Sequence, residues 1–275
     1  MTRSVFLDRE LPLAHAGETV EVTGPVAHHI RVTRIGAEEE FDLVDGAGRR
    51  LRCVLAAPAA AAPAQDDGRR SRRRGKDGEK PLRAHVLDVT REAPGAPRLV
   101  LVQALAKAGR DEQAIESATE IGVDLIVPWA AARSIAAWPA AKEERAVAKW
   151  RSLLDTAAQQ SRRALAPERE PLARGSAVLD RLRETDRVLV LHEEASDHLA
   201  DVLEELAQET GTAPERIVLI VGPEGGLAPE EIDALREAGA TPVLLGPTVL
   251  RASSAGPAGL ALAQAALGRW RRPLR

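Results

Sequence analysis

Five apolar runs of strand length recur through the second two-thirds of the chain, and they constrain the fold more than any other feature. They read RLVLVQAL (98–105), VDLIVPW (123–129), RVLVLH (187–192), RIVLIV (216–221) and TPVLLG (241–246). Longer segments with a helical period separate them. Apolar strands that alternate with helices are typical of a mostly parallel sheet covered by helices on both faces. We therefore predict an α/β domain over residues 95–275.

The segments between these runs carry the helical signals. A helix is predicted over 111–121, where apolar residues share one face, and Gly122 supplies its stop signal. Trp150 lies in the apolar stripe of a longer amphipathic segment. Two further helices are predicted, one from about Ser196 and one from Pro229, whose first turn is acidic.

The N-terminal part has a different pattern. Short apolar runs such as SVFL, ETVEVTG and RRLRCVLA alternate with turn signals. Strand-like segments at this spacing favour a small β-barrel or β-sandwich. We predict a mostly β domain over residues 1–94, with a basic insertion at about 56–80.

The insertion is the main concentration of positive charge. Asp66 to Arg83 contains eight basic and four acidic residues, although the whole chain has a formal net charge of -3. The stretch has no hydrophobic period and reads as a long loop. Two interpretations stay open: a solvated insertion without function, or an arm that neutralises RNA phosphates. The candidate phosphate contacts in this arm are Arg69, Arg70, Arg72, Arg73 and Arg74.

Composition narrows the classes of function. Cys53 is the only cysteine, which excludes an intrachain disulfide and fits a reducing compartment. The six histidines have no ligand spacing, so we expect no metal. Without a signal-peptide-like start or a run of membrane-spanning length, we expect a cytoplasmic protein with no membrane partner. The absence of tyrosine argues against RNA binding through stacked aromatic side chains.

A glycine-rich turn follows the run that ends at Val221. The sequence VGPEGGLAPEE (221–231) places it at the carboxyl end of a strand, where open α/β sheets bind ligands. It lacks the Gly-Lys-Ser/Thr ending of a Walker loop, and its GxxGG spacing differs from the dinucleotide fingerprint. Glu224 adds a negative charge to the turn, which argues against a polyphosphate ligand.

A second turn, LGPTVLRASSA (245–255), follows the next predicted strand. Ser253 or Ser254 is predicted to cap the helix that follows, with Pro257 in its first turn. Two Gly-Pro corners at the ends of neighbouring strands predict a slot lined by backbone groups and leucines. Such a slot suits a flat, largely uncharged adenosine.

Taken together, GPEGG (222–226) and LGPTVLRASSA (245–255) resemble the knotted SPOUT methyltransferases, and more closely the RsmE-type family that methylates N3 of a uridine in small-subunit ribosomal RNA. Three other segments resemble that family as well. They are KAGRDEQAIESATEIGVDLIVPWAAARS (107–134), AAQQSRR (157–163) and HHIRVTRIGAEEEFDLVDG (28–46). The resemblance thus extends along nearly the whole chain.

The resemblance implies a fold and an activity. The N-terminal domain would be a PUA-like barrel, and the second domain would end in a trefoil knot that binds S-adenosylmethionine. A homodimer packed partly through the C-terminal helix would methylate 16S rRNA in the decoding-region helix, on the assembled small subunit. The residues implied around the cofactor are Leu191, Gly222, Pro223, Glu224, Gly225, Gly226, Leu245, Gly246, Leu250 and Ser253.

The sequence departs from the family near the expected methyl site. Where the family has Arg-Ile-Leu-Arg-Thr-Glu-Thr-Ala, residues 248–255 read TVLRASSA, so Ser253 replaces an acidic side chain. The remaining polar candidates for catalysis are Arg251 and Glu224. Uridine N3 must lose a proton before it attacks, with the help of a base or of a cation that stabilises the anion. Arg251 is the candidate stabiliser or a phosphate contact. Glu224 is the candidate proton acceptor, a cofactor-orienting group or a cap for backbone N–H groups.

Further RNA contacts are expected outside the insertion. They are Arg31, Arg34, Lys107, Arg110, Arg133, Gln160 and Arg162. A solvated helix end is the alternative for Gln160 and Arg162. Three functions remain: the rRNA uridine N3-methyltransferase, a knotted methyltransferase with another target such as a ribose 2′-hydroxyl, and a ribosome-assembly RNA-binding protein with little turnover.

Overall fold

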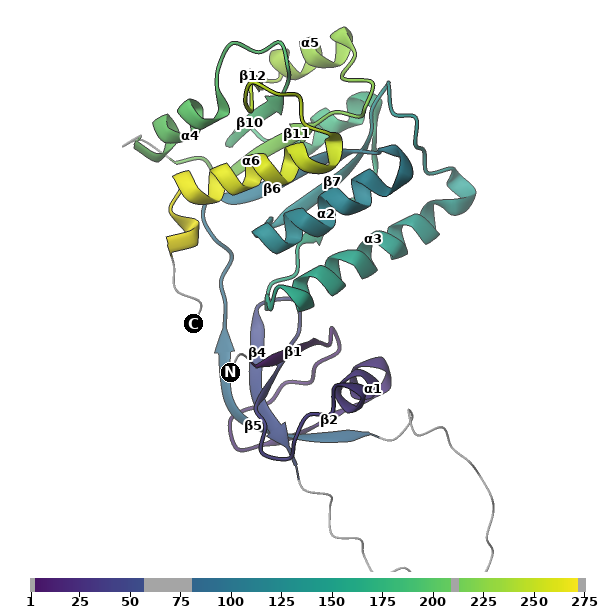
Figure 1. Cartoon of the computed structure of the whole chain (residues 1–275), viewed down its shortest axis with the longest axis vertical. Helices are drawn as coiled ribbons and strands as arrows, with labels where there is room; N and C mark the ends of the chain where they lie inside the picture. Colours follow the sequence, from purple (N-terminus) through teal and green to yellow (C-terminus); the bar gives the residue numbers. More distant parts are fainter. Residues whose placement is uncertain (1–2, 57–80, 209–212, 272–275) are drawn as a thin grey trace, which may run out of the picture. The chain divides into compact units, whose positions relative to one another are not determined.

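The computed structural model describes residues 3–56, 81–208 and 213–271 (Figure 1). The predicted arm contacts between Arg69 and Arg74 therefore lie outside the described residues. The chain forms two compact units, the first from residues 1–93 with 162–165 and the second from 94–161 with 166–275. The segment 162–165, expected in the second domain, belongs to the first unit.

The first unit is built on a five-stranded sheet with the order β1-β3-β4-β5-β2. Its strands are β1 (Ser4–Leu7), β2 (Thr19–Val22), β3 (Phe41–Val44), β4 (Arg49–Leu55) and β5 (Leu82–Arg91). β1 pairs with β3 in parallel, and the other pairs are antiparallel. Phe6, Phe41 and Leu51 are among the side chains that fill its core. The mostly β composition predicted for this region agrees with these strands.

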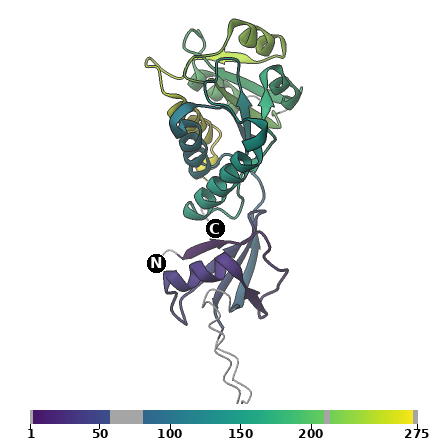
Figure 2. The same ribbon diagram turned by 90° about the vertical axis from the view of Figure 1, so that its right-hand side faces the viewer.

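A helix interrupts the strands of this unit. Helix α1 (Gly24–Thr33) lies beside the sheet in the turned view (Figure 2) and contains His28 and His29. Pro25 occupies its first turn, where a missing N–H costs nothing. Ala27 and Ile30 are one helical turn apart and almost fully buried. The strand-like pattern of this part of the sequence did not predict the helix.

The second unit contains a sheet whose strand pairs are all parallel. Its order is β12-β10-β11-β6-β7-β8, and β9 also pairs with β7. The strands are β6 (Arg98–Ala104), β7 (Leu125–Ala130), β8 (Glu168–Arg169), β9 (Ala173–Arg174), β10 (Asp186–Leu191), β11 (Arg216–Val221) and β12 (Thr241–Val243). All five apolar runs of the sequence form strands here, and the predicted α/β class is confirmed.

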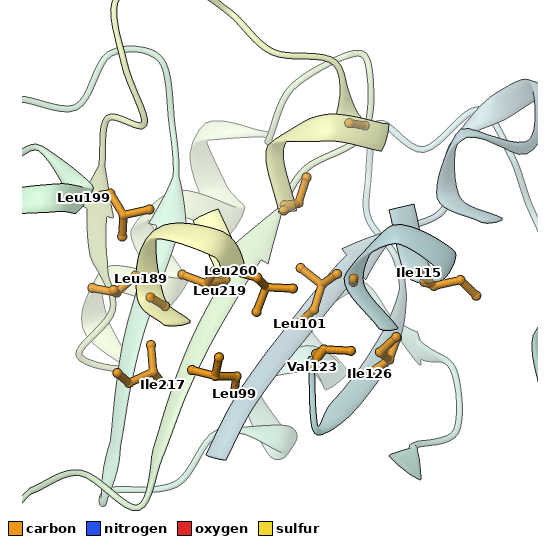
Figure 3. Close-up of a cluster of buried hydrophobic side chains, with 14 of the residues drawn as sticks. Leu99, Leu101, Ile115, Val123, Ile126, Leu189, Leu199, Ile217, Leu219 and Leu260 are labelled. Carbon is orange, nitrogen blue, oxygen red and sulfur yellow. The ribbon is translucent and has the colours of Figure 1, made fainter. Parts of the chain in front are cut away.

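Helices cover both faces of this sheet. They are α2 (Arg110–Ile121), α3 (Ala140–Gln160), α4 (Leu199–Gln208), α5 (Pro229–Glu237) and α6 (Ala252–Ala266). Leu99 and Leu101 of β6 face a core formed with α2, α3, α4 and α6 (Figure 3). Val100 and Val102 point to the opposite face, toward α5. Alternate residues of one strand thus fill two separate apolar layers.

Helix α6 rests directly on the sheet through two glycines. A Cβ on Gly256 would lie 2.9 Å from Leu101 Cδ1, and one on Gly259 would lie 3.1 Å from Leu219 Cδ1. Larger residues at these two places would push α6 away from β6 and β11. The close packing fixes the start of α6 above the carboxyl half of the sheet.

The start of α6 differs from the sequence prediction. Arg251 is the N-cap residue, in extended conformation, and its carbonyl accepts N–H bonds from Ser254 at 2.8 Å and Ala255 at 3.0 Å. Neither Ser253 nor Ser254 caps the helix, because both lie inside its first turn. Pro257 is the sixth residue of the helix, beyond the first turn, so both of these predictions are wrong.

Candidate active site at the carboxyl ends of the strands

Three turns meet at one edge of the parallel sheet. The register places Leu191, the last residue of β10, beside Val221 of β11 and Val243 of β12. The turns after β10 and β12 are also tied to each other, since the N–H of Leu244 donates to the Asp197 carbonyl at 2.7 Å. The strand ends that the sequence selected as a ligand site therefore lie together.

A pocket of about 370 Å³ opens between the turn after β12 and helix α6. Its lining residues are Leu245, Gly246, Thr248, Leu250, Ala258, Ala261 and Leu262. Its size falls within the range of about 300 to 1,000 Å³ that is usual for small-molecule sites. Three predicted cofactor residues, Leu245, Gly246 and Leu250, line this one pocket. Its walls carry no ionisable side chain and suit an uncharged, flat group.

The glycine loop, residues 222–226, closes as a tight turn in which the N–H of Gly226 donates to the Pro223 carbonyl at 2.9 Å. Gly226 has a φ of 70°, which favours glycine. A Cβ on Gly222 would lie 2.9 Å from Leu227 Cδ2, and one on Gly225 would lie 3.3 Å from Arg133 Cβ. The chain's own side chains therefore account for part of the glycine requirement.

Glu224 is already bonded within the protein. Its Oε1 accepts the backbone N–H of Lys107 at 3.2 Å and Nη1 of Arg110 at 3.0 Å. The side chains of Arg110 and Glu224 are only 31% and 17% exposed. Of the roles predicted for Glu224, the geometry favours the capping of nearby backbone N–H groups. Arg110, predicted as an RNA contact, forms an ion pair with Glu224.

The remaining polar candidates of the second unit lie around these turns. Arg133 is exposed, and its Nη1 donates to the Gly225 carbonyl at 3.3 Å. Lys107 is exposed beside Arg110, and Arg251 is exposed at the N-terminus of α6. Gln160 is the last residue of α3. Their roles toward RNA or cofactor stay predictions.

Two further predicted cofactor residues are Leu191, which packs beneath α6, and Ser253, which belongs to α6. Leu191 is part of the packing on Gly259, where its Cδ1 would lie 3.6 Å from an added Cβ. Ser253 is buried in the first turn of the helix. Among the predicted RNA contacts in the first unit, Arg31 lies in α1, Arg34 is its left-handed C-cap, and Arg162 has a φ of 59°.

Two carboxylates that the sequence reasoning missed hold the turns in place. Asp111 is buried at the start of α2, where burial raises the pKa of its carboxyl although backbone N–H bonds oppose the shift. Glu231 accepts the N–H groups of Ala132 at 2.7 Å and Ala228 at 3.0 Å. The available signal was the acidic first turn of each helix.

Two kinds of feature are absent from the described ranges. Within residues 3–56, 81–208 and 213–271, no three His, Cys, Asp or Glu side chains are grouped so that they could hold a metal ion. No helix in the same ranges is both long and apolar enough to cross a membrane.

Comparison with known proteins identifies the class of the second unit. Residues 94–264 match the family model of an RNA methyltransferase domain. The ribosomal RNA small subunit methyltransferase E of Mycobacterium bovis is 38% identical over 265 residues, which cover 92% of this chain and 91% of the relative. That of Bacillus subtilis is 25% identical, with 86% of each chain covered. The chain belongs to the ribosomal RNA small subunit methyltransferase E family, and the resemblance found in the sequence is confirmed.

Solved structures share the fold. The methyltransferase E of Neisseria gonorrhoeae, bound to S-adenosylmethionine, has a TM-score of 0.77 at 24% identity and covers 96% of this chain and 98% of its own. A probable rRNA-methyltransferase from Porphyromonas gingivalis has a TM-score of 0.71 at 20% identity, with 98% and 100% covered. Both likenesses cover nearly the whole length of this chain.

Proposed function

We propose that this protein methylates N3 of a uridine in 16S rRNA with S-adenosylmethionine as the methyl donor. Dependence on S-adenosylmethionine and action on small-subunit rRNA follow from the family. The observation that carries the proposal is the apolar pocket at the carboxyl ends of the strands, inside the part of the chain that matches RNA methyltransferases.

The pocket fits the adenosine of the cofactor. Leu245 and Leu250 offer apolar walls for a flat ring, and Gly246, with no atom within 4 Å of an added Cβ, leaves its backbone open. The bound cofactor supplies an electrophilic methyl group. We assign the adjoining contacts to Leu191, the glycine loop and Ser253, the other residues that the family resemblance implies.

Arg251 is the residue to which we assign the stabilisation of the anionic uracil. Its guanidinium is exposed at the N-terminus of α6, where the helix dipole adds positive potential. The guanidinium charge and the positive end of the helix dipole both favour the deprotonated uracil over the neutral one. With the anion stabilised there, the N3 proton can leave to water at the exposed rim. Holding the base in line with the methyl group then contributes most of the remaining acceleration.

A trefoil knot is part of the proposal. The chain leaves β11, adds β12 on the far side of β10, and returns as α6 across β11 and β6. A knot further requires that the returning chain pass through a loop formed by an earlier segment, and the family resemblance supports that step. For the first unit we propose a PUA-like barrel that binds RNA, with Arg31, Arg34 and Arg162 among its contacts.

We also propose a homodimer. Large apolar side chains are exposed on and beside the C-terminal helix, with Val249 at 77%, Trp270 at 55% and Leu262 at 37%. A second copy covering this surface would remove it from water, which stabilises association. The dimer would act in the cytoplasm on the assembled small subunit.

The test begins with calorimetry of S-adenosylmethionine binding, followed by incubation with small subunits that lack the modification and mass mapping of the methylated nucleotide. We expect binding, and one methyl group at a uridine N3. A methyl group on a ribose 2′-hydroxyl would replace the uridine N3 reading with the alternative target. Failure to bind the cofactor would favour the assembly protein with little turnover.

A further inference from the structure

The turn between β6 and α2 has an unfavourable backbone. Ala108 has φ 56° and ψ 33°, and the next residue, Gly109, has φ 71° and ψ 17°. Left-handed backbone suits glycine but costs energy for alanine. None of the residues in the 3-10 helical turn Lys107–Gly109 is buried, so apolar packing does not hold this conformation. Polar contacts must hold it.

Glu224 supplies those contacts from the neighbouring strand end. Its Oε1 binds both the N–H of Lys107, before Ala108, and the guanidinium of Arg110, after Gly109. The two bonds bracket the left-handed pair. Glu224 Oε2 is buried and has no hydrogen-bond partner within the described part of the chain. Oε1 is thus occupied by two donors, and Oε2 is shielded from solvent.

We infer that Glu224 and Arg110 are positioning residues whose ion pair fixes the Lys107–Gly109 turn against the glycine loop, so that the exposed Lys107 ammonium meets an RNA phosphate. Arg133 also contacts the loop, through the bond from its Nη1 to the Gly225 carbonyl, so two exposed cations adjoin the loop. Phosphate contacts of this kind place the RNA without reading its sequence. The RNA part of this inference rests on the proposed function.

Two substitutions of Glu224 distinguish a proton acceptor from a positioning residue. Glu224→Gln keeps an acceptor oxygen for both donors, so we expect it to raise KM for the small subunit less than Glu224→Ala does. Glu224→Ala removes the acceptor and should raise KM for the small subunit about ten-fold, a typical effect of a lost hydrogen bond to a charged group. The pH profile of kcat should stay in place in both. Glu230→Ala, which removes an exposed carboxylate nearby, is the matched control and should leave KM unchanged.

A substitution at Ala108 should partly restore the Glu224→Ala variant. Because glycine takes the left-handed conformation without strain, Ala108→Gly should lower KM of the Glu224→Ala variant about five-fold. A lost proton acceptor could not be restored in this way. Arg110→Met should raise KM less than Glu224→Ala, which also removes the Lys107 bond. The double variant should be no worse than Glu224→Ala alone, because that variant already lacks the ion pair.

Hydrogen exchange of the amides of residues 106–111 tests the bonds between Glu224 and the Lys107–Gly109 turn without enzyme turnover. Glu224→Ala should speed exchange of the Lys107 amide, and Glu224→Gln should not. If wild-type protein fails to methylate RNA while this exchange result holds, the proposed function is wrong and the positioning of the turn by Glu224 is confirmed. If Glu224→Gln abolishes kcat and exchange is unchanged in both variants, Glu224 is the proton acceptor and our inference is wrong.

Discussion

Gly225 lies where the glycine loop passes the backbone of Arg133. A Cβ there would lie 3.3 Å from Arg133 Cβ and 3.4 Å from its carbonyl oxygen. Gly225→Leu must therefore displace the loop, and we expect calorimetry to show cofactor affinity more than about ten-fold lower, by overpacking. RNA affinity and its salt dependence should persist. Gly225→Ala, which needs a shift of only a few tenths of an ångström, is the control. A leucine variant with normal cofactor affinity would remove the glycine loop from the cofactor site.

Cys53 gives a second prediction at the residue scale. It is fully buried in β4, and burial, with a smaller contribution from the Asp42 charge, raises the pKa of its thiol from 9.0 to about 12. As the pH rises, the unfolded chain releases the thiol proton first. The contribution of the protonated thiol to the free energy of unfolding is therefore fully present below about pH 9 and is lost as the pH rises toward 12. The loss is on the order of 4 kcal/mol, from about three pKa units. Urea unfolding from pH 7 to 11 checks this, and Cys53→Ala should lack the dependence. The native thiol should also resist thiol reagents at pH 8.

At the scale of elements, the parallel strands were the most predictable feature. Each is buried on both faces, so it appears in the sequence as an unbroken apolar run, and the run 216–221 coincides with β11. The start of α6 was less predictable, because Ser253 and Ser254 match a capping pattern while the backbone of Arg251 decides the cap. Helix α1 was missed because Ala27 and Ile30 are its only buried residues, which leaves a weak period.

The candidate site was predictable in place but not in its contacts. Strand ends and glycines indicated the edge of the sheet at which Leu245 and Leu250 line a pocket. The bond between Arg110 and Glu224 joins residues 114 positions apart, and no local pattern predicts such a pairing. The consequence is chemical, since the sequence left Glu224 open as a proton acceptor, a cofactor-orienting group or a cap, and the structure shows it bonded to Lys107 and Arg110.

At the scale of the molecule, the order of strands and the limits of the units required the structure. β12 lies beyond β10 although it follows β11 in the chain. Residues 162–165 belong to the first unit, where the Ala164 carbonyl accepts the N–H of Gly48 at 2.9 Å. Ala164 is fully buried against Val5 and Val44. This short stretch has no composition that distinguishes it from the end of a helix, so the sequence assigned it to its neighbours.

The distribution of charge across the chain gives the last prediction. Residues 66–80 contain seven basic and four acidic side chains, in a protein whose formal net charge is -3. If this segment neutralises RNA phosphates, deleting it should weaken binding to small-subunit RNA. It should also lower the slope of log affinity against log salt by about two units. Seven basic and four acidic residues leave a net charge of +3, and each of about three neutralised phosphates of a single strand contributes roughly 0.7 to the slope. Cofactor affinity should not change. Replacing Arg69, Arg70, Arg72, Arg73 and Arg74 by glutamine at constant length separates charge from chain length. A solvated insertion would leave the slope as it is in both variants, so an unchanged slope rejects the RNA arm. A slope lowered in both variants assigns the effect to the arginines.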